Sequence, residues 1–132
     1  MNKEIVRYEQ AIDLYELGFY ETCANLYCDK ELVTQSYYDK YVNGLCDDEV
    51  KTIFAPTLQQ ANQWLMDNKQ WYIYLIPIWS IDTNERLWTV RLYNLDTCQE
   101  YYYMYQNQSY YETMSWGLNR VLDILSKRDN HI

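Results

Sequence analysis

The sequence predicts an α+β protein in which helices pack on one face of an antiparallel sheet. Three observations lead to this fold class. Apolar residues recur at helical spacing in three stretches, runs with two-residue alternation lie between those stretches, and turn residues separate neighbouring runs. The expected order of elements is α-β-β-α-β-β-β-α, because short turns join strands that then pair with their neighbours.

The first expected element is a helix over residues 3–17. Its apolar stripe consists of Ile5, Tyr8, Ile12 and Tyr15, with Ala11 and Leu14 beside it. Gly18 follows where a left-handed C-terminal cap would fall, and Phe19 is placed to fold back onto the last turn. A hairpin is then expected from TCANLYC and LVTQ, which a short charged turn separates. Residues 37–51 show no sustained periodicity and contain Asn43-Gly44, so a long loop is expected there.

The second half begins with a helix that starts at a capping-box pattern. Thr57 and Gln60 form that pattern, and Pro56 disfavours helix before it. The buried face of this helix is expected to hold Leu58, Ala61 and Leu65, with Trp64 at its margin. WYIYLIPIWSI, the turn DTNE and RLWTVRLYNL then predict a β-hairpin. Pro77 cannot donate to a strand ladder, so its strand is expected at a sheet edge or bulged.

The last strand and the last helix come from residues 99–127. EYYYMY alternates Tyr101, Tyr103 and Tyr105 on one side with Tyr102 and Met104 on the other, as a strand does. Ser109 with Glu112 is a second capping box, which predicts a helix through about Lys127. The apolar stripe of that helix is Tyr111, Met114, Leu118, Val121, Leu122 and Leu125.

A chain of 132 residues fits one domain, over residues 1–132. Residues 1–52 would hold the N-terminal helix, the hairpin and the loop, and residues 53–132 would form an α-β-β-β-α unit. The sequence leaves open whether the two halves share one sheet.

The net charge of −8 disfavours two kinds of partner. Residues 1–51 carry five Lys and Arg against eleven Asp and Glu, a balance of −6, while residues 52–132 carry six against eight, a balance of −2. Phosphate backbones and anionic membrane surfaces repel such a protein. The N-terminus MNKEIVRYEQ has no apolar signal region and no run is long enough to cross a bilayer, so a cytoplasmic protein with reduced thiols is expected.

The residues that usually carry catalysis are sparse, so no enzyme, cofactor or metal site is predicted. The single histidine, His131, lies next to the C-terminus, and the three glycines are too scattered to form a phosphate-binding loop. Cys23 and Cys28 lie in one expected strand at an odd separation, so they would point to opposite faces. The acids Asp47-Asp48-Glu49 fit a solvated loop. Spatial pairs of carboxylates are invisible in one sequence, and nothing singles one out.

Three segments together resemble a family of small uncharacterised proteins found in bacteriophages, prophages and gut bacterial mobile elements. They are ELGFYETC (16–23), APTLQQANQWL (55–65) and YETMSWGLNRVLDIL (111–125). The family has no established activity, so the resemblance implies no catalytic residues. It implies a phage-type or mobile-element accessory protein that acts inside a bacterium. A host or phage protein is the partner expected if the chain is an interaction module.

The tyrosines of the second half suggest a binding surface on the sheet. If Trp88, Val90 and Leu92 face the helices, then Leu87, Thr89, Arg91 and Tyr93 face away. The face away from the helices would then hold Tyr72, Tyr74, Arg91, Tyr93, Tyr101, Tyr103 and Tyr105. Tyrosine around an arginine is a composition enriched at protein–protein hot spots. The alternative is that tyrosine merely suits strands, or that the N-terminal hairpin covers this face.

Three functions are compatible with these observations. The first is a non-enzymatic protein–protein interaction module that uses the tyrosine face or the acidic N-terminal half, the latter as a mimic of nucleic acid. The second is RNA or single-strand binding, since residues 57–128 share the α-β-β-β-α order of double-stranded RNA-binding domains and sheet tyrosines can stack on bases. The third is a homo-oligomeric structural protein that associates through an edge strand or the tyrosine face.

Overall fold

The computed structural model describes residues 4–42 and 52–126 of the chain. Its helices are α1 (Tyr8–Glu16), α2 (Gln35–Tyr37), a π-helical turn η1 (Tyr38–Val42), α3 (Leu58–Lys69) and α4 (Tyr110–Leu125). Its strands are β1 (Asn25–Cys28), β2 (Glu31–Thr34), β3 (Thr52–Phe54), β4 (Trp71–Ser80), β5 (Glu85–Asn94) and β6 (Gln99–Asn107). The predicted α+β class is confirmed.

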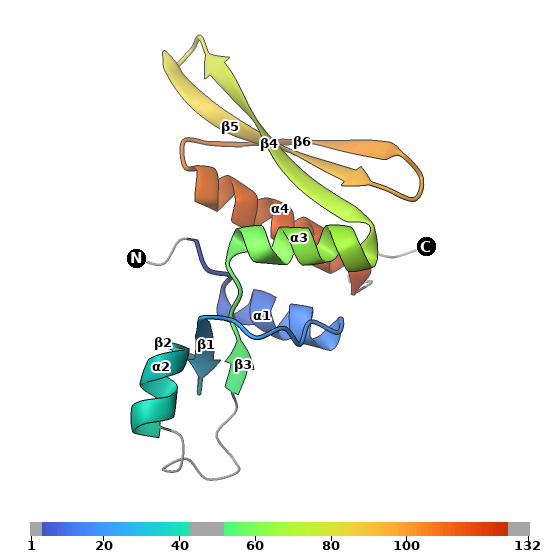
Figure 1. The fold of residues 1–132 in the computed structure, drawn as a ribbon. Coiled ribbons are helices and arrows are strands. Elements are labelled where there is room, and N and C mark those ends of the chain that lie inside the picture. The colour runs from blue at the N-terminus through green and yellow to red at the C-terminus, as the bar shows by residue number, and fades with distance from the viewer. Residues whose placement is uncertain (1–3, 43–51, 127–132) are drawn as a thin grey trace.

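The elements form successive layers (Figure 1). The sheet β4-β5-β6 lies at one end, and α3 and α4 pack beneath it on one face. Helix α1 contacts α4 on the side away from this sheet, and the small sheet β2-β1-β3 lies beyond. The sequence left open whether the two halves share one sheet: strands β1 and β2 of the first half and strands β4, β5 and β6 of the second half lie in two separate antiparallel sheets, while β3, at the boundary between the halves, joins the small sheet.

Helix α1 begins at Tyr8, five residues later than predicted, because the side chain of Gln10 accepts a hydrogen bond from the Arg7 backbone N–H at 2.7 Å and starts the helix there. The helix buries Gln10, Ala11 and Leu14. The predicted apolar stripe was wrong for Tyr15, whose side chain is 53% exposed. The predicted cap is confirmed: Gly18 has φ +108°, and the Phe19 N–H donates to the Leu14 carbonyl at 2.9 Å.

The predicted N-terminal hairpin is confirmed as β1 and β2. Its two turn residues, Asp29 and Lys30, both have positive φ, as a tight hairpin turn requires. Strand β3 was not predicted; it pairs with β1 on the side opposite β2. Cys23 lies before β1 rather than inside it. The expected loop over 37–51 is helical through Val42, and its remainder, including Asn43-Gly44, lies outside the described residues.

Both predicted helix starts in the second half are confirmed. The Thr57 hydroxyl accepts from the Gln60 N–H at 3.0 Å, and the Ser109 hydroxyl accepts from the Glu112 N–H at 3.2 Å. Helix α4 ends at Leu125, and Lys127 lies outside the described residues. The hairpin β4-β5 pairs without interruption from Trp71–Asn94 to Ser80–Glu85, with Pro77 on an edge strand as predicted.

The main core lies between the large sheet, α3, α4 and α1. Its fully buried side chains include Leu14, Leu65, Ile73, Val90, Leu92, Leu118, Val121 and Leu122. Gly117 lets α4 approach the sheet closely, because a Cβ there would lie 2.8 Å from the Val90 Cγ2 and 2.9 Å from the Ile73 Cγ2. Tyr111 was predicted on the buried stripe of α4 but is 37% exposed.

Candidate functional site

Strand pairing places four of the seven predicted site residues together. Tyr72 pairs with Tyr93, and Tyr74 pairs with Arg91, so these four side chains share one face of the β4-β5 hairpin. Ile73 and Val90, which alternate with them, are buried against α4. The four residues therefore lie on the face away from the helices, as predicted.

The placement of Tyr101, Tyr103 and Tyr105 on that face was wrong. Tyr101 pairs with the buried Leu92, and its ring lies 5.5 Å from that of Trp71. The rings of Tyr103 and Tyr105 lie 5.4 Å and 4.6 Å from the ring of Trp116 on α4. The physical reason is the register of β6 on β5, which pairs Arg91 with Tyr102 and so turns the odd-numbered tyrosines toward the helix.

The residues that take their place are Glu100, Tyr102 and Met104, which the sequence did not single out as site residues. Tyr102 and Met104 are 68% and 95% exposed. We define the outer sheet face as Tyr72, Tyr74, Arg91, Tyr93, Glu100, Tyr102 and Met104. A sequence signal for two of them existed, since Tyr102 and Met104 alternate with the other tyrosines; only the strand register was missing.

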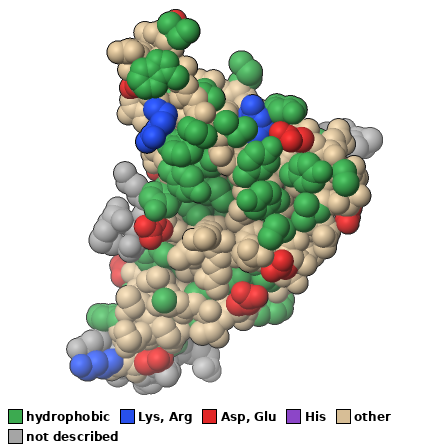
Figure 2. Space-filling view, turned by 45° about the horizontal axis from the view of Figure 1, so that its top comes forward, with side chains coloured by type: hydrophobic (Ala, Val, Ile, Leu, Met, Phe, Trp, Pro, Cys, Tyr) green, Lys and Arg blue, Asp and Glu red, His purple; other side chains and the backbone are tan. Residues whose placement is uncertain are grey.

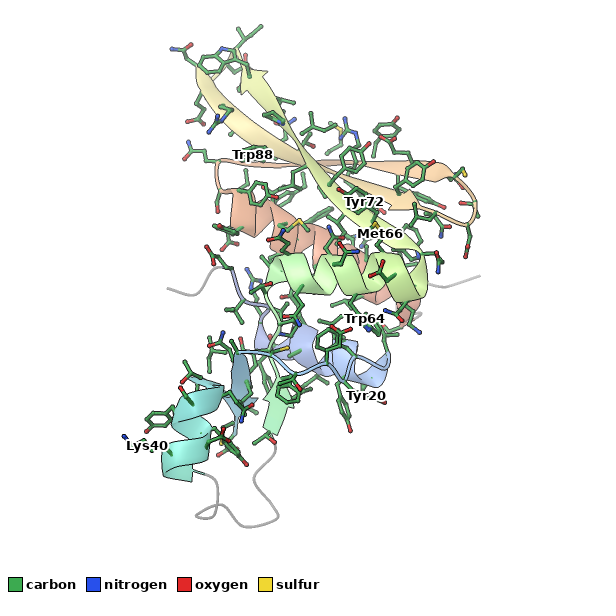
Figure 3. All side chains as sticks on the ribbon, viewed as in Figure 1. Tyr20, Lys40, Trp64, Met66, Tyr72 and Trp88 are labelled. Carbon is green, nitrogen blue, oxygen red and sulfur yellow. The ribbon has the colours of Figure 1, made fainter. Side chains whose placement is uncertain are left out.

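Among the described residues, no helix or strand covers the outer sheet face. The helices lie between the N-terminal hairpin and the sheet β4-β5-β6 (Figure 1). The alternative in which this hairpin covers the outer sheet face is therefore wrong. Figure 2 shows hydrophobic side chains gathered on this side of the molecule, with single charged side chains among them. Figure 3 shows Tyr72 on the sheet and Tyr20 on the far side of the helices.

Arg91 organises the centre of the outer sheet face. Its Nε lies 3.8 Å from a carboxylate oxygen of Glu100, and its guanidinium carbon lies 4.6 Å from the centroid of the Tyr102 ring. Glu100 also raises the pKa of Tyr74, mainly through a hydrogen bond with that hydroxyl. A hydrogen bond with Cys98 raises the pKa of Tyr93. The ion pair and the ring contact hold Arg91 in place on the sheet, and a side chain that is already held loses less entropy when a surface binds.

A cleft of about 610 Å³ borders the outer sheet face at the β4 edge. It lies between the starts of α3 and α4 and is lined by residues that include Glu4, Gln59, Tyr72, Tyr74, Tyr110 and Tyr111. The Tyr111 hydroxyl donates to the Glu4 carboxylate at 3.0 Å, and this bond raises the pKa of Tyr111. Tyr72 and Tyr74 belong to both the cleft and the outer sheet face, so the two surfaces are continuous.

Two further observations concern groups that could carry chemistry. Burial raises the pKa of the Cys23 thiol to about 11, which keeps it protonated and weakly nucleophilic. Within residues 4–42 and 52–126, His, Cys, Asp and Glu side chains do not gather in threes that could hold a metal ion. The acids Asp47-Asp48-Glu49 and Cys46 lie outside the described residues.

Comparison with protein-family models, with curated proteins and with solved structures finds no match to this chain. Of the helices in the described ranges, none combines the length and the apolar character needed to cross a membrane.

Proposed function

We propose that this protein is a non-enzymatic protein–protein interaction module and that the outer sheet face binds its partner. The observation that carries the proposal is an uncovered sheet face with four tyrosines around an arginine that is already held by Glu100 and Tyr102. Tyrosine, methionine and arginine are enriched at protein interfaces. Met104, at 95% exposed, has no structural reason to be apolar within the described chain.

The proposed setting is the bacterial cytoplasm, with a host or phage protein as the partner. Its support is the resemblance of the segments 16–23, 55–65 and 111–125 to small proteins of phages and mobile elements. The expected role is that of a phage-type or mobile-element accessory protein.

The test is capture of a partner from bacterial lysate by tagged wild type and by the double variant Tyr102→Ser/Met104→Ser. Both side chains are exposed, so the variant is expected to fold as wild type does. The matched control is Tyr20→Ser/Ile81→Ser, which removes two other exposed apolar side chains away from the outer sheet face. We expect the control to retain a captured protein that the outer-face variant loses. If both variants captured the same protein equally well, the outer sheet face would not be the binding surface.

The RNA-binding alternative has one observation in its favour, the α-β-β-β-α order of α3, β4, β5, β6 and α4. Element order alone is a weak guide to function, and helix α4 opens with Tyr110, Tyr111 and Glu112 rather than with lysines. Retardation of RNA or single-stranded DNA at low salt, abolished by Tyr102→Ser/Met104→Ser, would establish this alternative in place of the proposal.

A further inference from the structure

We infer that the cleft between α3, β4 and α4 receives a cationic side chain, arginine or lysine, from the protein partner. This inference rests on the proposed function and deepens it, because it states the chemistry that the partner must present beside the outer sheet face. It follows from the shape of the cleft, from the rings that line it and from its charge.

The cleft offers aromatic ring faces in two pairs. The rings of Tyr72 and Tyr74 are stacked, with centroids 5.8 Å apart and planes inclined by 19°. The rings of Tyr110 and Tyr111 meet edge to face at 5.5 Å, and Tyr110 is also held by Trp88 at 5.1 Å. Tyr72, Tyr110 and Tyr111 are each between 37% and 45% exposed, so a ligand can reach their rings. The faces of tyrosine rings attract ammonium and guanidinium groups.

The charge of the cleft has one sign. Among the described residues that line the cleft, Glu4 is the single formally charged side chain, and none is a lysine or an arginine. The hydrogen bond from the Tyr111 hydroxyl fixes the Glu4 carboxylate at the wall of the cleft. A cation that enters can therefore contact ring faces and a positioned carboxylate together.

The two helix starts beside the cleft do not reverse this preference. At the start of α3, the Leu58 N–H donates to the Glu4 carbonyl at 2.7 Å and the Gln60 N–H donates to the Thr57 hydroxyl. At the start of α4, the Glu112 N–H donates to the Ser109 hydroxyl. These bonds occupy donors that would otherwise favour an anion.

The volume and the position of the cleft fit a side chain from a partner that already covers the sheet. About 610 Å³ lies within the range of small-ligand sites, so a guanidinium or ammonium group on its aliphatic stem can be accommodated. Tyr72 and Tyr74 connect the cleft to the outer sheet face around the β4 edge. The net charge of −8 also steers a basic partner toward this protein.

The test uses a probe in place of the unidentified partner. N-acetyl-arginine methylamide is titrated into ¹⁵N-labelled protein, and the amide shifts are followed by NMR, with acetate as the anionic counterpart. We expect saturable shift changes at Tyr72, Ile73 and Tyr110 in wild type. Glu4→Gln is expected to weaken binding about threefold, the size of an exposed ion pair, and Tyr72→Leu is expected to weaken it by a similar factor.

The matched control is Glu9→Gln, which removes one acid of α1 and should leave the affinity for the probe unchanged. Absence of saturable shifts in wild type, or stronger shifts with acetate than with the arginine probe, would overturn the inference. The variant Tyr102→Ser/Met104→Ser leaves the cleft intact and should bind the probe as wild type does. The NMR titration therefore tests cation binding in the cleft, while the lysate capture tests partner binding to the outer sheet face.

Discussion

At the scale of single residues, Gln10 joins the N-terminal unit to the rest of the molecule. It is 2% exposed, and its Nε2 donates to the carbonyl and hydroxyl of Ser115 and to the Asn119 side chain, at 2.9–3.1 Å. Its Oε1 accepts from the Arg7 N–H. One amide thus starts α1 and fixes α1 on α4, which explains why a polar side chain occupies the buried face of this helix.

Replacement of Gln10 by leucine keeps the volume and removes all of these hydrogen bonds. We expect the free energy of unfolding to fall by about 2–3 kcal/mol, because the Asn119 side chain and the Arg7 N–H lose buried partners. Urea denaturation measures the change. The control Gln63→Leu removes an exposed glutamine that bonds only Asp67 in the described structure, and should change the free energy by less than about 0.5 kcal/mol. Similar losses in both variants would contradict the role given to Gln10.

Burial also separates the reactivity of two cysteines. The pKa of Cys23 rises from 9.0 to about 11, mainly through desolvation, while Cys98 is exposed. At pH 8 a rise of this size reduces the thiolate fraction about 100-fold. We expect iodoacetamide to modify Cys98 well before Cys23, as peptide mapping by mass spectrometry would show. Equal rates at the two cysteines would show that Cys23 is not protected.

The same pKa shift predicts a dependence of stability on pH. The folded state binds the thiol proton of Cys23 more tightly than the unfolded state does. Its contribution to the free energy of unfolding is therefore complete below pH 9.0 and is lost as the pH rises through about 11. Cys23→Ala should make the fall in stability between these pH values shallower in urea titrations. An unchanged slope would assign the fall to other groups.

At the scale of elements, two features of the edge strand β4 hinder its pairing with a strand from another molecule. Strand β4 is an edge strand of the large sheet, and the Asn62 side chain bonds both the N–H and the carbonyl of Ile73, at 3.0 Å and 2.8 Å. Backbone groups of alternate residues point the same way in an antiparallel pair, so Pro77 lacks its N–H on this outward edge. A clamped residue and a proline thus flank Leu75. This disfavours self-association through β4, although it leaves the oligomeric alternative to mass measurement by light scattering.

Replacement of Asn62 by leucine should expose this edge. We expect faster hydrogen exchange at the Ile73 amide and a loss of about 1–3 kcal/mol in the free energy of unfolding, because two backbone groups lose their partners. The control Asn68→Leu removes an amide near the end of α3 whose side chain donates to the Trp64 carbonyl of the same helix. Unchanged exchange at Ile73 in the Asn62 variant would show that the clamp is not needed.

At the scale of the whole molecule, local sequence patterns predicted most of the helices and strands. The two N-caps at Thr57 and Ser109, the Gly18 cap and the β4-β5 hairpin depend on neighbouring residues, so they are visible without a structure. Strand β3 was missed because three residues carry no periodicity, and its pairing with β1 crosses about 25 residues of chain. The two-sheet layering depends on such long-range pairing.

The candidate site was predictable only in part, for a related reason. The tyrosine content of the sheet is plain in the sequence, and Tyr72, Tyr74, Arg91 and Tyr93 share a face because the four-residue turn after Ser80 fixes their register. Strand β6 pairs Tyr102 with Arg91 and Tyr101 with Leu92, and alternation alone does not reveal which set of β6 residues shares the face of Arg91. The exposed side chains of β6, Tyr102 and Met104, were therefore assigned to the face that packs on the helices. The cleft beside β4 could not be predicted.

The separation of the tyrosines onto two faces is the central claim, and the free energy of unfolding of two neighbouring variants tests it most directly. Tyr102→Ser removes an exposed ring on Arg91 and should cost less than about 1 kcal/mol. Tyr103→Ser removes a ring packed on Trp116 and should cost about 2–3 kcal/mol. Losses in this order would support the outer sheet face as the surface free to bind. A larger loss for Tyr102→Ser than for Tyr103→Ser would reverse the faces and contradict the proposed function.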